Sequence, residues 1–124
     1  MPINPTHAYL KAKIDAATPA ELTLMLYNGA IKFCNLGIKA IDEKDIVNAH
    51  NYIKRTEKII NELQATLNDD YETAKDFHNV YKYIQELLTW ANVKKDKELL
   101  TRARKVITEM RDTWVQVIEI VKNS

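Results

Sequence analysis

Prolines are confined to the start of this chain and glycines are rare, and this distribution limits the fold more than any other feature. All three prolines occur before residue 20, and only two glycines occur among the 124 residues. Because these two residue types most often interrupt helices and form turns, residues 20–124 are expected to be almost entirely helical. The length suits one domain with one core. The sequence therefore predicts a single all-α domain.

Apolar residues at three- and four-residue spacing divide this region into four helices, at about residues 19–42, 46–67, 72–93 and 97–122. The first opens with the capping box Thr18-Pro19-Ala20-Glu21. Asp45 and Asp96 are expected to be the N-caps of the second and fourth helices. Short connections make consecutive helices antiparallel. The expected fold is an antiparallel, up-down-up-down four-helix bundle covering residues 18–124.

The first helix has apolar residues on two neighbouring faces. We assign the first face to the core; it contains Leu22, Met25, Leu26, Gly29, Phe33, Leu36 and Ala40. The second face contains Leu24, Tyr27, Ile31, Cys34, Ile38 and Ile41. Neighbouring helices or the N-terminal segment cover this second face in one interpretation. In the other, it forms a partly covered groove for another protein.

Residues 1–17 form an expected N-terminal arm that is partly helical. Its helical stretch is too short to be stable alone. Apolar anchors at Ile3, Tyr9, Leu10 and Ile14 would let the arm lie against the bundle or dock elsewhere. A frayed terminus is the alternative.

Charge and cysteine content exclude several classes of function. The 18 basic and 17 acidic residues are mixed along the chain, so no nucleic-acid partner is expected. No secretory signal pattern and no spanning apolar run is found, which predicts no membrane insertion. The single cysteine, Cys34, lies on an apolar helix face and suits a reducing cytoplasm.

The sequence contains none of the common motifs for catalysis or metal binding. A di-iron bundle needs Glu-x-x-His pairs, but Val47 and Lys75 precede His50 and His78 by three residues. No zinc-protease, paired-cysteine, phosphate-loop or nucleophile-elbow motif occurs. We therefore expect no enzymatic activity, no cofactor and no metal.

The segment Thr18-Pro19-Ala20-Glu21-Leu22-Thr23-Leu24-Met25-Leu26-Tyr27-Asn28-Gly29-Ala30-Ile31-Lys32-Phe33 closely resembles the flagellin-specific secretion chaperones of bacteria, the FliS family. Further similarities are Asn4-Pro5 with Ala8-Tyr9, Val80-Tyr81-Lys82-Tyr83-Ile84, Ala91-Asn92-Val93-Lys94-Lys95-Asp96 and Arg111-Asp112-Thr113-Trp114. These matches span nearly the whole chain in the same order. Two departures occur: Gln85-Glu86 replaces an adjacent arginine pair common in the family, and Asn28 stands where many relatives have Asp.

The resemblance implies a cytoplasmic export chaperone. Such a protein binds the disordered C-terminal region of flagellin, prevents its premature polymerisation and helps deliver it to the flagellar type III export gate. Other flagellar regulators are candidates for further partners. The arm is implied to cover part of the client surface when no client is bound, and its tyrosine to contact a gate component afterwards.

Combined with the two faces of the first helix, the resemblance assigns residues to these roles. Flagellin is expected to bind at Leu24, Tyr27, Ile31, Cys34 and Ile38, and at the aromatic row formed by Tyr83 and Trp90. The arm and export-gate contact is assigned to Ile3, Tyr9 and Leu10. The alternative from another class is a non-enzymatic helical bundle with a regulatory or dimerisation role, and a metal-dependent bundle enzyme is a distant third.

Overall fold

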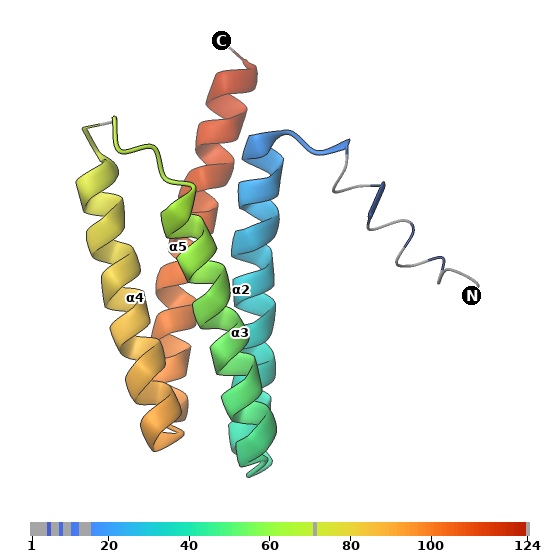
Figure 1. The fold of residues 1–124 in the computed structure, drawn as a ribbon, viewed down its shortest axis with the longest axis vertical. Helices are drawn as coiled ribbons and strands as arrows, with labels where there is room; N and C mark the ends of the chain where they lie inside the picture. Colours follow the sequence, from blue (N-terminus) through green and yellow to red (C-terminus); the bar gives the residue numbers. More distant parts are fainter. Residues whose placement is uncertain (1–4, 6–7, 9–10, 13–15, 71, 124) are drawn as a thin grey trace.

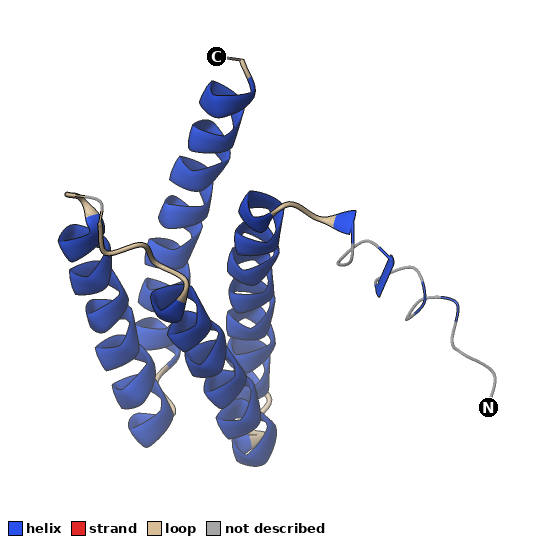
Figure 2. Cartoon of the chain, turned by 45° about the horizontal axis from the view of Figure 1, so that its top comes forward, coloured by secondary structure: helices blue, strands red, loops and turns tan. Residues whose placement is uncertain are grey.

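The computed structural model describes Pro5, Ala8 and residues 11–12, 16–70 and 72–123. Four long helices form the body: α2 (Pro19–Asp42), α3 (Ile46–Ala65), α4 (Ala74–Lys94) and α5 (Lys97–Lys122). No strand occurs among these described residues, as Figure 2 shows. Successive helices run in opposite directions, and each packs against two neighbours, so α2, α3, α4 and α5 surround one core in that order (Figure 1). The predicted all-α four-helix bundle is confirmed.

Three of the four helices begin at side-chain caps. The Thr18 hydroxyl accepts a hydrogen bond from the Glu21 amide at 3.2 Å, with Pro19 in the first turn of α2. The Asp45 carboxylate accepts from the Asn48 amide at 3.1 Å, and the Asp96 carboxylate accepts from two amides at the start of α5. Each cap satisfies amide groups that have no partner within the helix. These caps explain why the helix starts could be located from the sequence.

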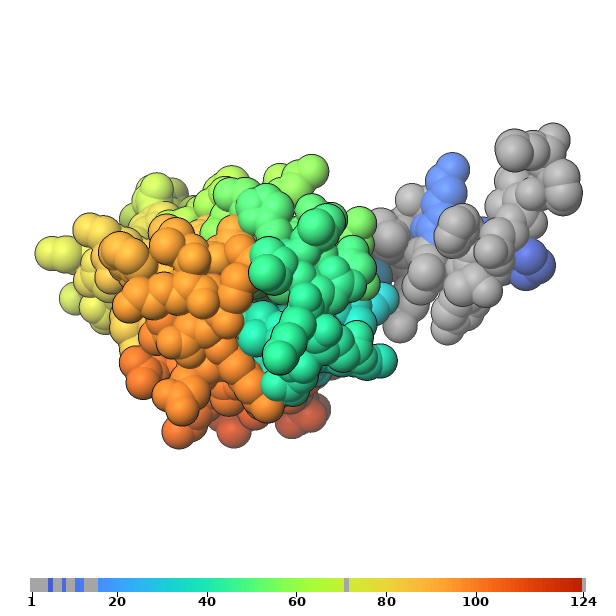
Figure 3. All heavy atoms as spheres, turned by 90° about the horizontal axis from the view of Figure 1, so that it is seen from below, coloured from blue at the N-terminus to red at the C-terminus, as the bar shows by residue number. Residues whose placement is uncertain are grey.

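Two connections at the same end of the bundle share one conformation. Both read Ala-x-x-x-Lys-Asp, at residues 40–45 and 91–96. Lys44 and Lys95 have left-handed backbone, with φ of 58° and 50°. In each, the aspartate amide then donates to the carbonyl of the alanine five residues earlier, at 2.8 and 3.0 Å. This 6→1 bond satisfies a terminal helix carbonyl and allows the next helix to start at once. Figure 3 views this end, where the two turns lie side by side over the core.

Aliphatic side chains from all four helices fill the core. The fully buried ones include Ile53, Ile60, Leu63, Ile84, Leu88, Leu100 and Ile107. Gly37 of α2 leaves room for the Leu100 side chain of α5, because a Cβ atom there would lie 2.9 Å from Leu100 Cδ2. A side chain at this position would require the buried Leu100 side chain to shift.

The assignment of the first face of α2 to the core is wrong for most of its residues, and of the two interpretations of the second face, cover by neighbouring helices describes its buried residues. Tyr27, Cys34 and Ile38 of the second face are buried in the core. The first face is mostly half-buried and runs along α3: Phe33 stacks on Tyr52. The physical reason is that α2 lies between α3 and α5, so the residues between these two contacts point to the centre. Helical periodicity shows how wide the apolar surface of a helix is. It does not show on which sides of the helix its neighbouring helices lie.

Candidate partner-binding surface

An apolar cavity of about 510 Å³ lies at the end of the bundle where α2 begins and α5 ends. Its walls come from all four helices and the connection between α3 and α4. The main apolar lining residues are Tyr27, Leu63, Leu67, Phe77, Tyr81, Met110, Trp114 and Val117. This volume is in the range of ligand-binding pockets, and it is large enough for side chains from a partner.

At the end of the bundle that holds the cavity, α5 extends past the start of α4. The α5 helix has 26 residues and α4 has 21, which at about 1.5 Å per residue leaves the C-terminal end of α5 about 7 Å longer. Figure 1 shows this end of α5 rising above the start of α4. The apolar stripe of α5 continues to the end of the helix, so Val117, Ile120 and Val121 are exposed, Ile120 to 68%.

Two buried tyrosines of the cavity wall are joined by a hydrogen bond. The hydroxyl oxygens of Tyr27 on α2 and Tyr81 on α4 are 2.6 Å apart, and this hydrogen bond spans the core between helices that are not neighbours in the bundle. Burial, together with the partner hydroxyl, raises the pKa of Tyr27 far above its ordinary value, and burial also raises the pKa of Tyr81. Both hydroxyls are therefore neutral hydrogen-bonding groups at physiological pH.

Trp114 joins the cavity wall to the start of α2. Its indole Nε1 donates a hydrogen bond to the Ala20 carbonyl oxygen at 3.0 Å, in the first turn after the N-terminal arm. The apolar ring lines the cavity while its polar edge is satisfied. Trp114 thereby fixes the beginning of α2 against α5.

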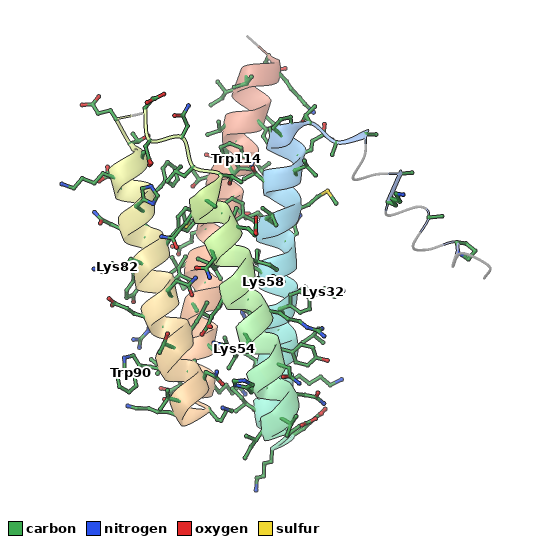
Figure 4. All side chains as sticks on the ribbon, in the orientation of Figure 1. Lys32, Lys54, Lys58, Lys82, Trp90 and Trp114 are labelled. Carbon is green, nitrogen blue, oxygen red and sulfur yellow. The ribbon has the colours of Figure 1, made fainter. Side chains whose placement is uncertain are left out.

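Exposed apolar residues also occur on α4 and α5 outside the cavity. On α4, Gln85 and Asn92 hydrogen-bond to α3. Tyr83 and Trp90 lie on the other side of the helix, towards α5, because they are two residues before Gln85 and Asn92. Figure 4 shows Trp90 on the side of α4 that points away from α3. We call the exposed set Tyr83, Trp90, Val117 and Ile120 the α4–α5 face.

The seven residues that we assigned to client binding fall into three groups. Tyr83 and Trp90 are exposed, Trp90 to 55%. Leu24 and Ile31 are half-buried, and Ile31 packs against the core. Tyr27, Cys34 and Ile38 are buried, so the interpretation in which neighbouring helices cover the second face describes them in this conformation. Flagellin binding at all seven positions stays a prediction.

The remaining predicted positions are also placed by the structure or lie beyond its description. Ile3, Tyr9 and Leu10 lie outside the described residues, and their assigned roles stay predictions.

Burial raises the pKa of the Cys34 thiol to about 12, so this cysteine is protonated and unreactive at neutral pH. Gln85, in place of one family arginine, donates to the Glu57 carbonyl and the Asn61 side chain at 3.0 and 2.9 Å. It therefore ties α4 to α3.

Most of the cavity residues were not predicted from the sequence. Phe77, Tyr81, Met110 and Trp114 follow the regular apolar spacing of their helices, and nothing in that spacing indicates an opening. One signal was available: the apolar stripe of the last helix extends past the length that α4 can cover.

Among the described residues, no group of three or more His, Cys, Asp or Glu could hold a metal ion, and no helix is long and apolar enough to span a membrane.

The fold and the site define a class: a small helical bundle with an open apolar cavity and an exposed apolar face next to it. Within that class, the chain belongs to the FliS family, since the family model described as flagellar protein FliS matches residues 2–121. The resemblance seen in the sequence is thus confirmed.

Curated relatives support the same assignment over nearly their whole length. The flagellar secretion chaperone FliS of Bacillus subtilis (strain 168) is 38% identical over 116 residues, which are 94% of this chain and 87% of the relative. The protein of the same name from Campylobacter jejuni subsp. jejuni serotype O:6 is 30% identical, over 90% of this chain and 88% of the relative. That of Vibrio cholerae serotype O1 is 28% identical, over 89% and 85%.

Proposed function

We propose that this chain is a cytoplasmic, non-enzymatic flagellar secretion chaperone. In this proposal it binds the C-terminal region of flagellin, prevents premature polymerisation and helps deliver flagellin to the flagellar type III export gate. The named relatives support the chaperone role. The observation that carries the binding role is the apolar cavity together with the α4–α5 face.

The chemistry of this surface suits an amphipathic helix formed by a disordered client. Such a helix places apolar residues at three- and four-residue spacing into a groove. Trp90 and Tyr83 would provide contacts along the α4–α5 face, and the cavity would accept an apolar anchor at its end. Leu24 and Ile31 are accessible in part, whereas Tyr27, Cys34 and Ile38 would support the surface from the core.

Binding of this kind is specific and still releasable without ATP. Folding a disordered segment onto a preformed surface buries roughly 1,000–3,000 Å², while its ordering costs about 2–5 kcal/mol. If the N-terminal arm covers part of the site, the apparent affinity falls in proportion to the fraction of molecules with the arm displaced. Contact of Tyr9 with an export-gate component would then favour transfer of the client.

Co-purification with full-length and C-terminally truncated flagellin tests the proposal. Full-length flagellin should co-purify with this chain and the truncated form should not. Sedimentation of the purified proteins should show a one-to-one complex. A stable homodimer that ignores flagellin would contradict the proposal and favour a dimerising regulatory bundle.

Two exposed aromatic residues allow a direct test of the surface. Tyr83→Ala and Trp90→Ala should each weaken binding of a flagellin C-terminal peptide by about tenfold, as expected for large apolar residues in an interface. Val47→Ala on α3 is the control, because Val47 is exposed but lies away from the α4–α5 face. Unchanged calorimetric affinity of both aromatic variants, with helicity preserved, would count against this face.

A further inference from the structure

A cluster of cations and aromatic rings lies on the opposite side of the bundle, where α2 packs against α3. The rings of Phe33 and Tyr52 stack with their centroids 6.3 Å apart. The Arg55 guanidinium lies 5.5 Å from the Phe33 centroid and 5.8 Å from that of Tyr52, and the Lys32 ammonium lies 5.9 Å from Phe33. We call these four residues the cation–aromatic cluster. The two rings hold the Arg55 guanidinium in place at the surface.

The cations of this cluster have no acidic partner in the part of the chain that the structure describes. No carboxylate there lies within 4.0 Å of a side-chain nitrogen of Lys32 or Arg55, nor of Lys58, which follows Arg55 by one helical turn. Figure 4 shows Lys32 on α2 and Lys58 on α3. The guanidinium therefore keeps its paired N–H donors available for an external carboxylate.

The charge imbalance extends along both helices, although the whole chain is nearly neutral. Residues 22–41 and 46–56 contain no Asp or Glu, while they contain Lys32, Lys39, Lys54 and Arg55. Glu57 is occupied by Lys54 at 2.9 Å. The next acidic residue on the outer side of α3 is Glu62, one turn beyond Lys58. Lys39 likewise pairs with Glu43 at 4.0 Å, so Lys32, Arg55 and Lys58 are the cations here that have no carboxylate partner among the described residues.

We propose that the cation–aromatic cluster is a second interaction surface, which binds an acidic segment of a partner protein. A carboxylate of the partner would accept two hydrogen bonds from the Arg55 guanidinium. An apolar partner residue beside that carboxylate would pack on the half-buried Phe33 and Tyr52 rings. Nucleic acid fits less well, because the site offers few cations and the net charge of the chain is only +1. The surface lies on the opposite side of the bundle from the α4–α5 face, so a second partner could bind while a client occupies that face.

Binding of a defined peptide to the full-length protein tests this proposal. The probe is a fluorescein-labelled peptide in which glutamate alternates with leucine, and its control carries glutamine in place of glutamate. Fluorescence anisotropy at low salt should show binding of the acidic peptide only, weakening as salt rises. Arg55→Gln should weaken binding about fivefold, and Arg55→Lys should have an intermediate effect, because lysine keeps the charge but loses the planar fork.

Matched variants separate this surface from general electrostatics and from the client site. Lys105→Gln on α5 removes another exposed positive charge, away from the cluster, and should leave the affinity unchanged. Arg55→Gln should also leave flagellin-peptide affinity unchanged. The proposal is overturned if the glutamine peptide binds equally well, if Arg55→Gln and Lys105→Gln have equal effects, or if an oligonucleotide displaces the acidic peptide more effectively than unlabelled peptide does.

Discussion

At the scale of single residues, the most informative contact is the hydrogen bond between the Tyr27 and Tyr81 hydroxyls. Both side chains are 3% exposed, so neither hydroxyl can exchange its partner for bulk water. The pKa values of both tyrosines are raised in the folded state, which means that the folded environment favours the neutral hydroxyl over the phenolate. The resulting stability is present below the ordinary tyrosine pKa of 10.0 and is lost as the pH rises beyond it.

This pair should show strong non-additivity when it is mutated. Tyr27→Phe leaves the Tyr81 hydroxyl buried without a partner, and it should lower the free energy of unfolding by about 1–3 kcal/mol. Tyr81→Phe should have a similar effect. The double Phe variant should be more stable than the sum of the single losses predicts, because both polar groups are then removed. Urea unfolding of the four proteins measures this; strictly additive losses would mean that each hydroxyl has another partner.

At the scale of helices, the sequence predicted the elements well and the orientation of α2 poorly. The caps Thr18, Asp45 and Asp96 and the repeated Lys-Asp turns are local signals, and local signals determine where helices start and stop. Which face of α2 becomes the core depends instead on the positions of α3 and α5. The α2 helix has two apolar faces because it packs against two neighbouring helices. A wide apolar surface on this helix therefore did not by itself indicate an external partner.

The contact between α2 and α5 contains one of the departures from the family pattern. Arg111 Nη1 lies 3.4 Å from Asn28 Oδ1, and its other nitrogens contact Asp112. Asn28→Asp, which restores the residue common in relatives, would convert this long hydrogen bond into an ion pair. We expect a gain of about 0.2–1 kcal/mol in the free energy of unfolding, decreasing with salt.

Thermal or urea unfolding at two salt concentrations measures that gain. The control is the same change in an Arg111→Gln background, where no cation is available and the gain should disappear. An equal gain in both backgrounds would show that the effect comes from the helix itself and not from the contact between α2 and α5.

At the scale of the whole molecule, the bundle has one closed end and one open end. The two Lys-Asp turns cover one end, whereas at the other end the cavity opens beside the first turn of α2. The sequence predicted the bundle because periodicity and short connections are sufficient for it. The cavity could not be predicted in the same way, since it depends on how Phe77, Met110 and Trp114 from different helices fail to fill the space between them.

This arrangement leads to a separation of roles between the bundle and the arm, and that separation can be tested. If the bundle binds flagellin and Tyr9 contacts the export gate, Tyr9→Ala should leave calorimetric affinity for the flagellin C-terminal peptide unchanged. With flagellin saturating, the same variant should be captured less by an immobilised export-gate component, because an aromatic anchor of a contact is lost. Trp90→Ala is the matched comparison, since it should weaken flagellin binding but be captured normally once flagellin saturates it. Equal capture of the Tyr9→Ala variant and the unmodified chain would remove Tyr9 from the gate contact while leaving the client site on the bundle intact.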